Sequence, residues 1–329
     1  MATGLALPSP LARVRDYVLS RHWTFLTGAT LFAMILTLIV FAPWISGHDP
    51  AKQALLLRLK PPSAEHWLGT DNLGRDLFSR ILHGGRFTVS IAAITVVLTV
   101  VIGTIVGVIS GRKGGFVDDL LMRVVDLLLS VPDAIIAIFL VAIIGPGFGT
   151  LVLALTIVGW TPYARLARGL TMEVNSRDYI RAAEVLGMSR SYIVFRHVIP
   201  NMIRPISAVS FLRFGHKLIT VGGLSFLGLG VQPPASDWGL MLADAQPFLE
   251  RAPMLMIAPG LAIFLTALSV TWIGQGLEID RRGPRALTDT SQPPARRLDP
   301  RSDQGSGSPS DGGRKGKSDR ASVHDRAGG

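Results

Sequence analysis

Repeated apolar runs constrain this sequence more than any other feature. The first, WTFLTGATLFAMILTLIVFAP, covers residues 23–43 and follows a basic N-terminal stretch. A helix must have roughly 20 mostly apolar residues to cross the hydrocarbon core of a bilayer. Five further runs approach this length, at residues 87–110, 122–144, 151–170, 206–230 and 254–274. The sequence therefore predicts an all-α integral membrane protein with six transmembrane helices.

Composition supports this prediction. Hydrophobic residues make up 48% of the 329-residue chain, and the mean hydropathy is +0.40. The chain contains no cysteine, which excludes thiolate metal sites, disulfides and cysteine nucleophiles. The first run is longer than the apolar region of a secretory signal and lacks a small-residue cleavage site, so we expect a retained anchor helix.

Basic residues predict the orientation, because Lys and Arg favour the cytoplasmic side of a membrane. Residues 165–204 contain seven arginines, whereas the loop at 231–253 has three carboxylates and one arginine. An even number of spans places both termini on the same side. We therefore predict a multi-pass plasma-membrane domain at residues 22–282, preceded by a cytoplasmic N-terminal segment at 1–21. Residues 45–86 are expected outside, although they include six basic residues.

The C-terminal stretch, residues 283–329, is rich in Gly, Pro, Ser and basic residues. From Arg281 onward, eleven Lys and Arg stand against six Asp and Glu. We predict a disordered, basic cytoplasmic tail near anionic lipid. Nucleic-acid binding is not expected, because no aromatic residues are interleaved with the basic ones.

The segment RAAEVLGMSRSYIVFRHVIP, residues 181–200, is a basic, helix-like patch between two predicted spans. Its end signals predict two short cytoplasmic helices, with two serines as N-caps, a glycine as the left-handed turn between the helices and a proline to stop the second. The positions are Ser176, Ala182, Ala183, Gly187, Ser189 and Pro200. The small residues would let a partner's backbone approach closely. The residues alone leave an ordinary amphipathic interfacial hairpin as the alternative.

The spacing of Ala182-Ala183, Gly187 and Pro200 resembles the EAA loop of ABC importer permeases. Three long motifs elsewhere resemble the C-type permease subunit of dipeptide and oligopeptide importers. They are HWLGTDNLGRDLFSRILHGGR (66–86), GLSFLGLGVQPPASDWGLML (223–242) and APGLAIFLTALSVTWIGQGLEIDRR (258–282). The resemblance extends from about residue 12 to residue 282.

This resemblance implies the ABC importer permease fold and one half of a pore for short peptides in a bacterial inner membrane. The implied partners are a homologous permease, two cytoplasmic ATPases and an extracytoplasmic solute-binding protein, besides membrane lipid. The loop at 171–204 would carry the coupling helix that inserts into the ATPase. Its coupling residues would be Ala182, Ala183, Glu184, Gly187 and Pro200. The same architecture also serves nickel chelates and other small solutes.

Three positions depart from the family pattern. Arg181 replaces the glutamate for which the loop is named, and His197 occupies a normally hydrophobic position three residues before Pro200. The segment ITVGG, residues 219–223, stands where the family often has an acidic residue. The first two departures bear on how tightly the loop pairs with its ATPase.

Motifs for catalysis are missing from the sequence. The nearest match to a phosphate-binding loop, GRKGKS at 313–318, has its glycines three residues apart instead of five. We therefore expect partner subunits to use ATP and Mg²⁺, and this chain to bind no cofactor. The histidines are scattered, which predicts no metal site, and capping and loop order explain the carboxylates Asp71 and Asp76. A stand-alone channel or an intramembrane enzyme is the remote alternative.

Ionisable residues interrupt the third and fifth predicted spans. In the fifth, Arg213, His216 and Lys217 occupy positions i, i+3 and i+4 and so share one helix face. A charge at mid-bilayer costs about 3 kcal/mol or more, so this face should meet water or protein. Three explanations stay open: the residues extend to the membrane surface, pair with Asp126 or Asp133 of the third span, or line the translocation path.

Glycines at four-residue spacing lie in and just beyond the second predicted span. Gly103, Gly107 and Gly111 give a smooth helix face that another helix can approach closely. The partner is either another helix of this subunit or the sister permease.

Overall fold

The structure is a computed structural model that describes the backbone of residues 10–279 and the side chains of residues 23–278. All of these residues fall within one compact unit. Its regular elements are helices, apart from one isolated bridge between Thr70 and Asp76. The predicted tail at 283–329 lies outside the described residues, as do the first nine residues of the N-terminal segment.

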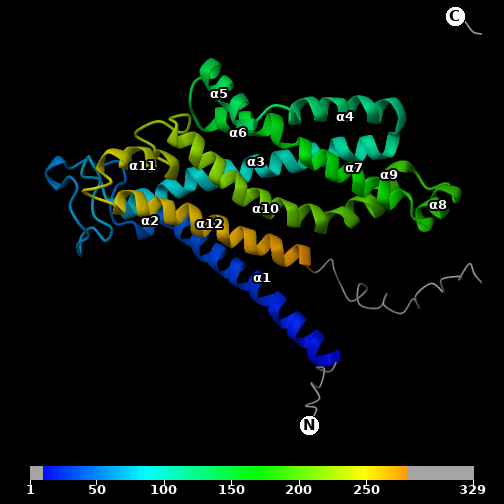
Figure 1. The fold of residues 1–329 in the computed structure, drawn as a ribbon, viewed down its shortest axis with the longest axis horizontal. Coiled ribbons are helices and arrows are strands. Elements are labelled where there is room, and N and C mark those ends of the chain that lie inside the picture. The colour runs from blue at the N-terminus through cyan, green and yellow to red at the C-terminus, as the bar shows by residue number, and fades with distance from the viewer. Residues whose placement is uncertain (1–9, 280–329) are drawn as a thin grey trace, which may run out of the picture. The chain divides into compact units, whose positions relative to one another are not determined.

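Four long helices dominate the described chain (Figure 1). They are α1 (Pro10–Val40), α3 (Leu77–Lys113), α10 (Ile199–Phe226) and α12 (Met254–Ile279). The shorter α-helices are α2 (Ala42–Ile45), α4 (Gly115–Leu129), α5 (Asp133–Ile144), α6 (Phe148–Gly159), α7 (Thr161–Asn175), α8 (Asp178–Val185), α9 (Arg190–Ile193) and α11 (Trp238–Ala245). Single turns η1 (Leu55–Leu57), η2 (Val194–Val198, a π-helical turn) and η3 (Gln246–Phe248) complete the set.

Length and apolarity support four membrane spans among the described residues, or five if a bent pair counts as one. The four are residues 23–40, α3, the combined stretch of α6 and α7, and α12. The bent pair is α4 and α5, which meet at an angle of 80° beside Pro132, a residue that cannot continue the helical hydrogen bonds. The predicted fifth span corresponds to α10. This helix is not among the four, because its cationic residues lower its mean hydropathy.

α3 begins ten residues before the predicted second span. Asp76 caps it by accepting a hydrogen bond from the backbone N–H of Ser79 (2.7 Å), so the helix includes the polar residues before the apolar run. At about 1.5 Å per residue, α3 is roughly 55 Å long. It runs from the segment at 45–76 to the region of α8 (Figure 1).

The glycine face of α3 packs on α7 within this subunit. A Cβ atom at Gly103 would lie only 2.5 Å from the backbone oxygen of Trp160, and one at Gly111 only 2.8 Å from the Cβ of Thr171. Gly107 meets α7 equally closely at Ala164. The sequence left open whether the partner of this face is a helix of the same subunit or the sister permease. The structure supports a helix of the same subunit, α7.

Glycines also bring α1, α10 and α12 together. At Gly274 of α12, a Cβ atom would lie 3.0 Å from the backbone nitrogen of Leu212 in α10. At Gly28 of α1, it would lie 2.7 Å from the backbone oxygen of Ser269 in α12. α12 therefore packs between the other two helices.

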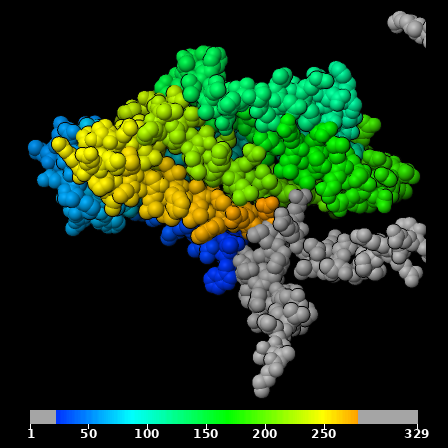
Figure 2. All heavy atoms as spheres, in the orientation of Figure 1, coloured from blue at the N-terminus to red at the C-terminus, as the bar shows by residue number. Residues whose placement is uncertain are grey.

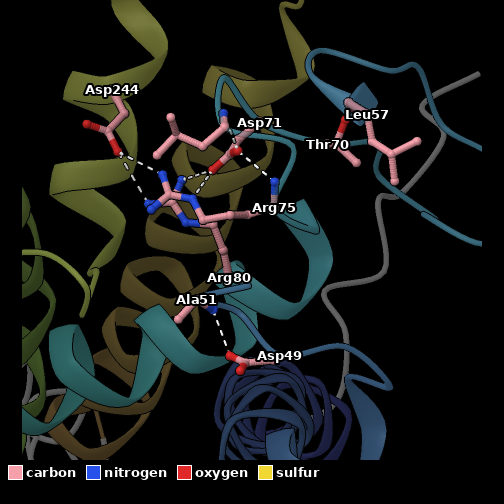
Figure 3. Close-up of polar contacts among 9 residues, drawn as sticks. Asp49, Ala51, Leu57, Thr70, Asp71, Arg75, Arg80 and Asp244 are labelled. Atoms are coloured by element: carbon pink, nitrogen blue, oxygen red, sulfur yellow. Dashed lines mark hydrogen bonds and ion pairs between the residues drawn. The ribbon is translucent and has the colours of Figure 1, made fainter. Parts of the chain in front are cut away.

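An ion-pair network holds the segment before α3 in place (Figure 3). The Asp71 carboxylate accepts hydrogen bonds from Arg75 Nε (2.6 Å) and Arg80 Nη1 (2.5 Å). Arg80 Nη2 also donates to Asp244 of α11, at 3.3 Å. The roles expected for both carboxylates are confirmed: Asp76 caps α3, and Asp71 orders its own loop by accepting two backbone N–H groups. Removing one partner of a buried pair costs about 3–5 kcal/mol, so the network fixes this segment against α11.

Candidate functional site

The bend at Gly187 has the geometry that the sequence predicts. Gly187 has φ +79°, in the left-handed region that glycine adopts without steric cost. Its N–H donates to the Glu184 carbonyl (3.0 Å), and the Met188 N–H donates to the Ala183 carbonyl (3.1 Å). These two hydrogen bonds form a Schellman motif, which ends α8 and turns the chain towards α9.

Of the other three predicted helix signals in this segment, one is confirmed and two are wrong. Ser189 caps α9, because its Oγ accepts a backbone N–H three residues on, at 3.2 Å. Ser176 instead ends α7, and the N-cap of α8 is Arg177. Pro200 does not stop a helix but lies in the first turn of α10, directly after the π-helical turn η2. The chain is therefore helical from α9 through η2 into α10.

One side of this segment is buried. Ala183 is 6% exposed and packs in an apolar cluster with Ile180 and Ile193. The cluster also contains residues of α3, α7 and α10, among them Tyr163 and Ile206. Ala183 therefore faces the subunit's own core rather than a partner, whereas Ala182, Glu184 and Pro200 are exposed.

The same segment also carries exposed apolar side chains. We call this surface the coupling face; it consists of Tyr179, Val185, Leu186, Met188, Tyr192 and Phe195. Val185 and Leu186 are 87% and 76% exposed, and Figure 2 shows the green surface of this region uncovered by other described residues. Clustered exposed apolar side chains mark interaction surfaces.

Polar contacts attach α8 to the far end of α3. Arg112 Nη1 donates to Glu184 Oε1 (3.2 Å) and to Asn175 Oδ1 (2.8 Å). Asn175 Nδ2 in turn donates to the Gly111 carbonyl (3.1 Å). Glu184 is half-exposed, so its pair contributes at most about 1 kcal/mol. These contacts therefore fix where α8 lies relative to α3 but contribute little to the free energy of unfolding.

Arg213, His216 and Lys217 of α10 line one cavity of about 220 Å³, together with residues of α3, α4, α5, α6 and α7. Lys217 Nζ donates to Asp133 Oδ2 at 3.0 Å, which confirms one of the predicted pairings. The Arg213 guanidinium lies over the Tyr163 ring, 5.5 Å from its centroid. His216 lines the same cavity. The shared helix face predicted for Arg213, His216 and Lys217 is confirmed.

The cavity wall carries a net positive charge. The second predicted partner, Asp126, pairs instead with Arg165, outside this cavity. Within the part of the chain that the structure describes, no carboxylate forms an ion pair with Arg213. A low-dielectric wall with an unneutralised guanidinium attracts anionic groups.

Comparison with known proteins identifies the family. The family described as "Binding-protein-dependent transport system inner membrane component" matches residues 103–282. This chain belongs to that family. A second family, "N-terminal TM domain of oligopeptide transport permease C", matches residues 9–62. The protein is thus an inner-membrane permease, and the family resemblance read from the sequence motifs is confirmed.

Curated relatives match this permease over most of its length. The Di/tripeptide transport system permease protein DppC of Pseudomonas aeruginosa is 37% identical over 83% of this chain and 92% of its own. The Probable D,D-dipeptide transport system permease protein DdpC of Escherichia coli is 36% identical, over 79% and 87%. The Nickel transport system permease protein NikC of the same species is 31% identical, over 83% and 99%.

A solved structure of the MetNI methionine ABC transporter, in an inward-facing conformation, shares the fold of this permease. The TM-score is 0.50 at 16% sequence identity, and the match covers 61% of this chain and 95% of the other. At this identity the likeness concerns the fold alone.

Sequence reasoning missed two side-chain groups in the segment before α3. The arginine network with Asp244 joins residues 164 positions apart, and no local pattern indicates such a contact. The second group is His48 and His66, which are scattered in the sequence but whose ring centroids lie 4.9 Å apart in the structure. These residues are separated by a loop that folds back, so helical spacing rules could not find them.

Proposed function

We propose that this permease forms one half of the translocation pore of an ATP-driven importer of short peptides. The observation that carries the proposal is the cationic cavity on α10, a helix that is joined to α9 at the coupling face through the π-helical turn η2. A displacement applied at α9 would pass along one helical path to the cavity wall. Such a path is what coupling of ATP hydrolysis to pore movement requires.

The proposed topology has six crossings. They are α1, α3, the bent pair of α4 and α5, the stretch of α6 and α7, α10, and α12. α10 has 28 residues, about 42 Å of helix, which exceeds the roughly 30 Å of hydrocarbon that it must cross. The Lys217–Asp133 pair reduces the cost of its charges. In this topology residues 1–21, 171–204 and 283–329 are cytoplasmic, and 45–86 are external.

The proposed coupling segment centres on Gly187. Ala182, Glu184 and the coupling face would contact an ATPase subunit, the Schellman motif would hold the bend, and buried Ala183 would anchor α8. Pro200 would mark where the segment joins α10. The apolar side chains of the coupling face support a protein partner rather than water as their environment.

The proposed assembly contains a homologous permease, two cytoplasmic ATPases and an extracytoplasmic solute-binding protein, surrounded by membrane lipid. ATP and Mg²⁺ would be used by the ATPases, and neither would be bound by this chain. No nucleic-acid partner is proposed. The family is a component of binding-protein-dependent transport systems, which favours a transporter subunit over a stand-alone channel or an intramembrane enzyme.

Short peptides are the proposed cargo, because relatives named for dipeptides and di/tripeptides are 36–37% identical to this chain. A free C-terminal carboxylate would be attracted by Arg213 and His216. Nickel transport is the second candidate, favoured by the 31% identity to the nickel permease. Glutathione is itself a peptide and fits the first class, and a glutathione permease relative is 40% identical.

Uptake in a strain that lacks only this permease tests the proposal. A labelled dipeptide should enter the parent strain and not the deletion strain, and unlabelled dipeptides should compete with it, whereas nickel should not. Unchanged dipeptide uptake in the deletion strain would refute a peptide substrate. If the deletion strain lost nickel uptake and kept dipeptide uptake, nickel would be the substrate instead.

A further inference from the structure

Two histidines and a glutamate converge beside the start of α3. His48 follows α2, whereas Glu65 and His66 come eleven and ten residues before Asp76, the N-cap of α3. One ligand atom from each of His48, Glu65 and His66 lies within 4.8 Å of the other two. The two imidazole rings are 4.9 Å apart between centroids. Imidazole nitrogens and a carboxylate oxygen in such a group are ligands for a divalent transition metal.

His66 is oriented as metal-binding histidines usually are. Its Nδ1 lies 2.9 Å from Asp76 Oδ1, and the other oxygen of that carboxylate caps α3 through the Ser79 N–H. The carboxylate is therefore fixed by the helix and in turn fixes the imidazole ring. A carboxylate on one ring nitrogen sets the tautomer and raises the basicity of the other nitrogen as a ligand.

The opposite ring nitrogen of His66 has no partner. His66 is 8% exposed, and its Nε2 is buried without a hydrogen bond to any described residue. Leaving a buried polar atom without a hydrogen bond is unfavourable. A bound cation would satisfy this nitrogen with its lone pair directed at the metal.

The other two groups are accessible from solvent. His48 and Glu65 are exposed, and they line an open cavity of about 300 Å³ together with Asp76, Trp67 and other residues. A cavity of this size has room for a cation and its remaining water ligands. An ion can therefore reach His48 and Glu65 from solvent, and the ring of the buried His66 lies directly beside that of His48.

We propose that His48, Glu65 and the Nε2 atom of His66 bind one divalent transition cation of the zinc class, with a fourth position open to water. Tetrahedral zinc accepts mixed nitrogen and oxygen ligands, whereas Mg²⁺ and Ca²⁺ prefer oxygen ligands throughout. The cation would tie the chain after α2 to the start of α3. This proposal does not depend on the cargo of the permease.

Direct binding measurements test the site. The full-length permease is purified without a polyhistidine tag, together with its co-purifying subunits. A chelator removes bound metal, and Zn²⁺ binding is then titrated by calorimetry. Mass spectrometry counts the metal ions that remain bound. We expect one Zn²⁺ per chain beyond any bound by the other subunits prepared alone. Co²⁺ in its place should give the intense visible absorption of tetrahedral coordination.

Variants separate this site from adventitious binding. His48→Ala and Glu65→Gln change exposed ligands and should each weaken Zn²⁺ binding at least about tenfold. Asp76→Asn keeps a good helix cap but removes the charge behind His66, and should weaken binding about 10–100-fold. His324→Ala is the matched control and should bind as the wild type does. Unchanged affinity in His48→Ala, or no bound metal in the wild type, would overturn the proposal.

Discussion

Lys217 and Arg213 lie on one face of α10, but we expect their substitutions to have different effects. Replacing Lys217 should lower stability, whereas replacing Arg213 should change transport. Lys217 is 7% exposed, and its Nζ lies 3.0 Å from Asp133 Oδ2. Lys217→Gln removes the cation and leaves the carboxylate without its partner. A fully buried pair broken in this way loses about 3–5 kcal/mol. Because Asp133 is about one-third exposed, we expect a loss of about 1–3 kcal/mol in the free energy of unfolding.

Arg213→Gln should behave differently. Arg213 contributes a cation–π contact of about 0.5–1 kcal/mol and no ion pair with a described residue, so the variant should be nearly as stable as the wild type. Its transport should change, because the cavity loses its unneutralised charge. Uptake of dipeptides with a free C-terminal carboxylate should fall more than uptake of the C-terminally amidated forms.

The assays are unfolding in mixed micelles and uptake into proteoliposomes that contain the whole complex. The double variant Asp133→Asn with Lys217→Gln leaves no unpaired charge, so it should recover most of the stability lost in Lys217→Gln. Strictly additive losses in the double variant would refute the pairing argument. Equal effects of Arg213→Gln on free and amidated dipeptides would refute a role for this side chain in the translocation path.

Three further predictions concern other regions. Ala183→Asp should destabilise the permease by about 3–5 kcal/mol because its charge is buried without a partner. Ala182→Asp on the exposed side should leave thermal unfolding unchanged and lower uptake; equal unfolding of the two would contradict the assigned faces. Burial raises the pKa of Asp237, so the folded chain holds that proton more tightly than the unfolded chain does. The free energy of unfolding should therefore fall as pH rises from the ordinary carboxyl pKa through the raised one. Asp237 caps α11 by accepting the Leu240 N–H at 2.9 Å. Asp237→Asn keeps a good cap and should flatten this part of the pH profile, and an unchanged slope would exclude Asp237 as its source. Truncation after Arg285 should leave uptake within about a factor of two, because the composition of 286–329 does not favour a packed structure; complete loss at normal expression would show that the tail is required.

Local features were predictable from the sequence, and contacts between distant segments were not. The apolar runs located most of the helices, and the Gly187 turn and the Ser189 cap follow from interactions within a few residues. Pro200 misled because proline is as compatible with the first turn of a helix as with the residues after its end. The early start of α3 depends on the N-cap Asp76. The sequence suggested that Asp76 is a cap, but it did not show that the helix would therefore begin before the apolar run.

The candidate sites divide in the same way. The shared face of Arg213, His216 and Lys217 follows from helical periodicity alone. The choice of Asp133 rather than Asp126 as the partner of Lys217 depends on the 80° bend between α4 and α5, which the sequence marks only by Pro132. The burial of Ala183 depends on packing against α7 and α10, so sequence spacing could not separate it from Ala182.

The central claim is that the bend at Gly187 couples ATP hydrolysis in a partner to transport through this permease. Gly187→Val forces a β-branched residue to φ +79°, at a cost of about 1–2 kcal/mol or more. No heavy atom of a described residue outside the turn lies within 4 Å of the added Cβ, so backbone strain is the main perturbation that we expect. Gly169→Val is the matched control, because Gly169 is equally uncrowded and lies inside α7.

The measurement is substrate-stimulated ATPase activity and peptide uptake of the reconstituted complex, recorded on the same preparations. We predict that Gly169→Val retains both activities, whereas Gly187→Val assembles in the membrane and loses both uptake and the stimulation by substrate. Wild-type uptake together with wild-type stimulation in Gly187→Val would contradict the coupling role.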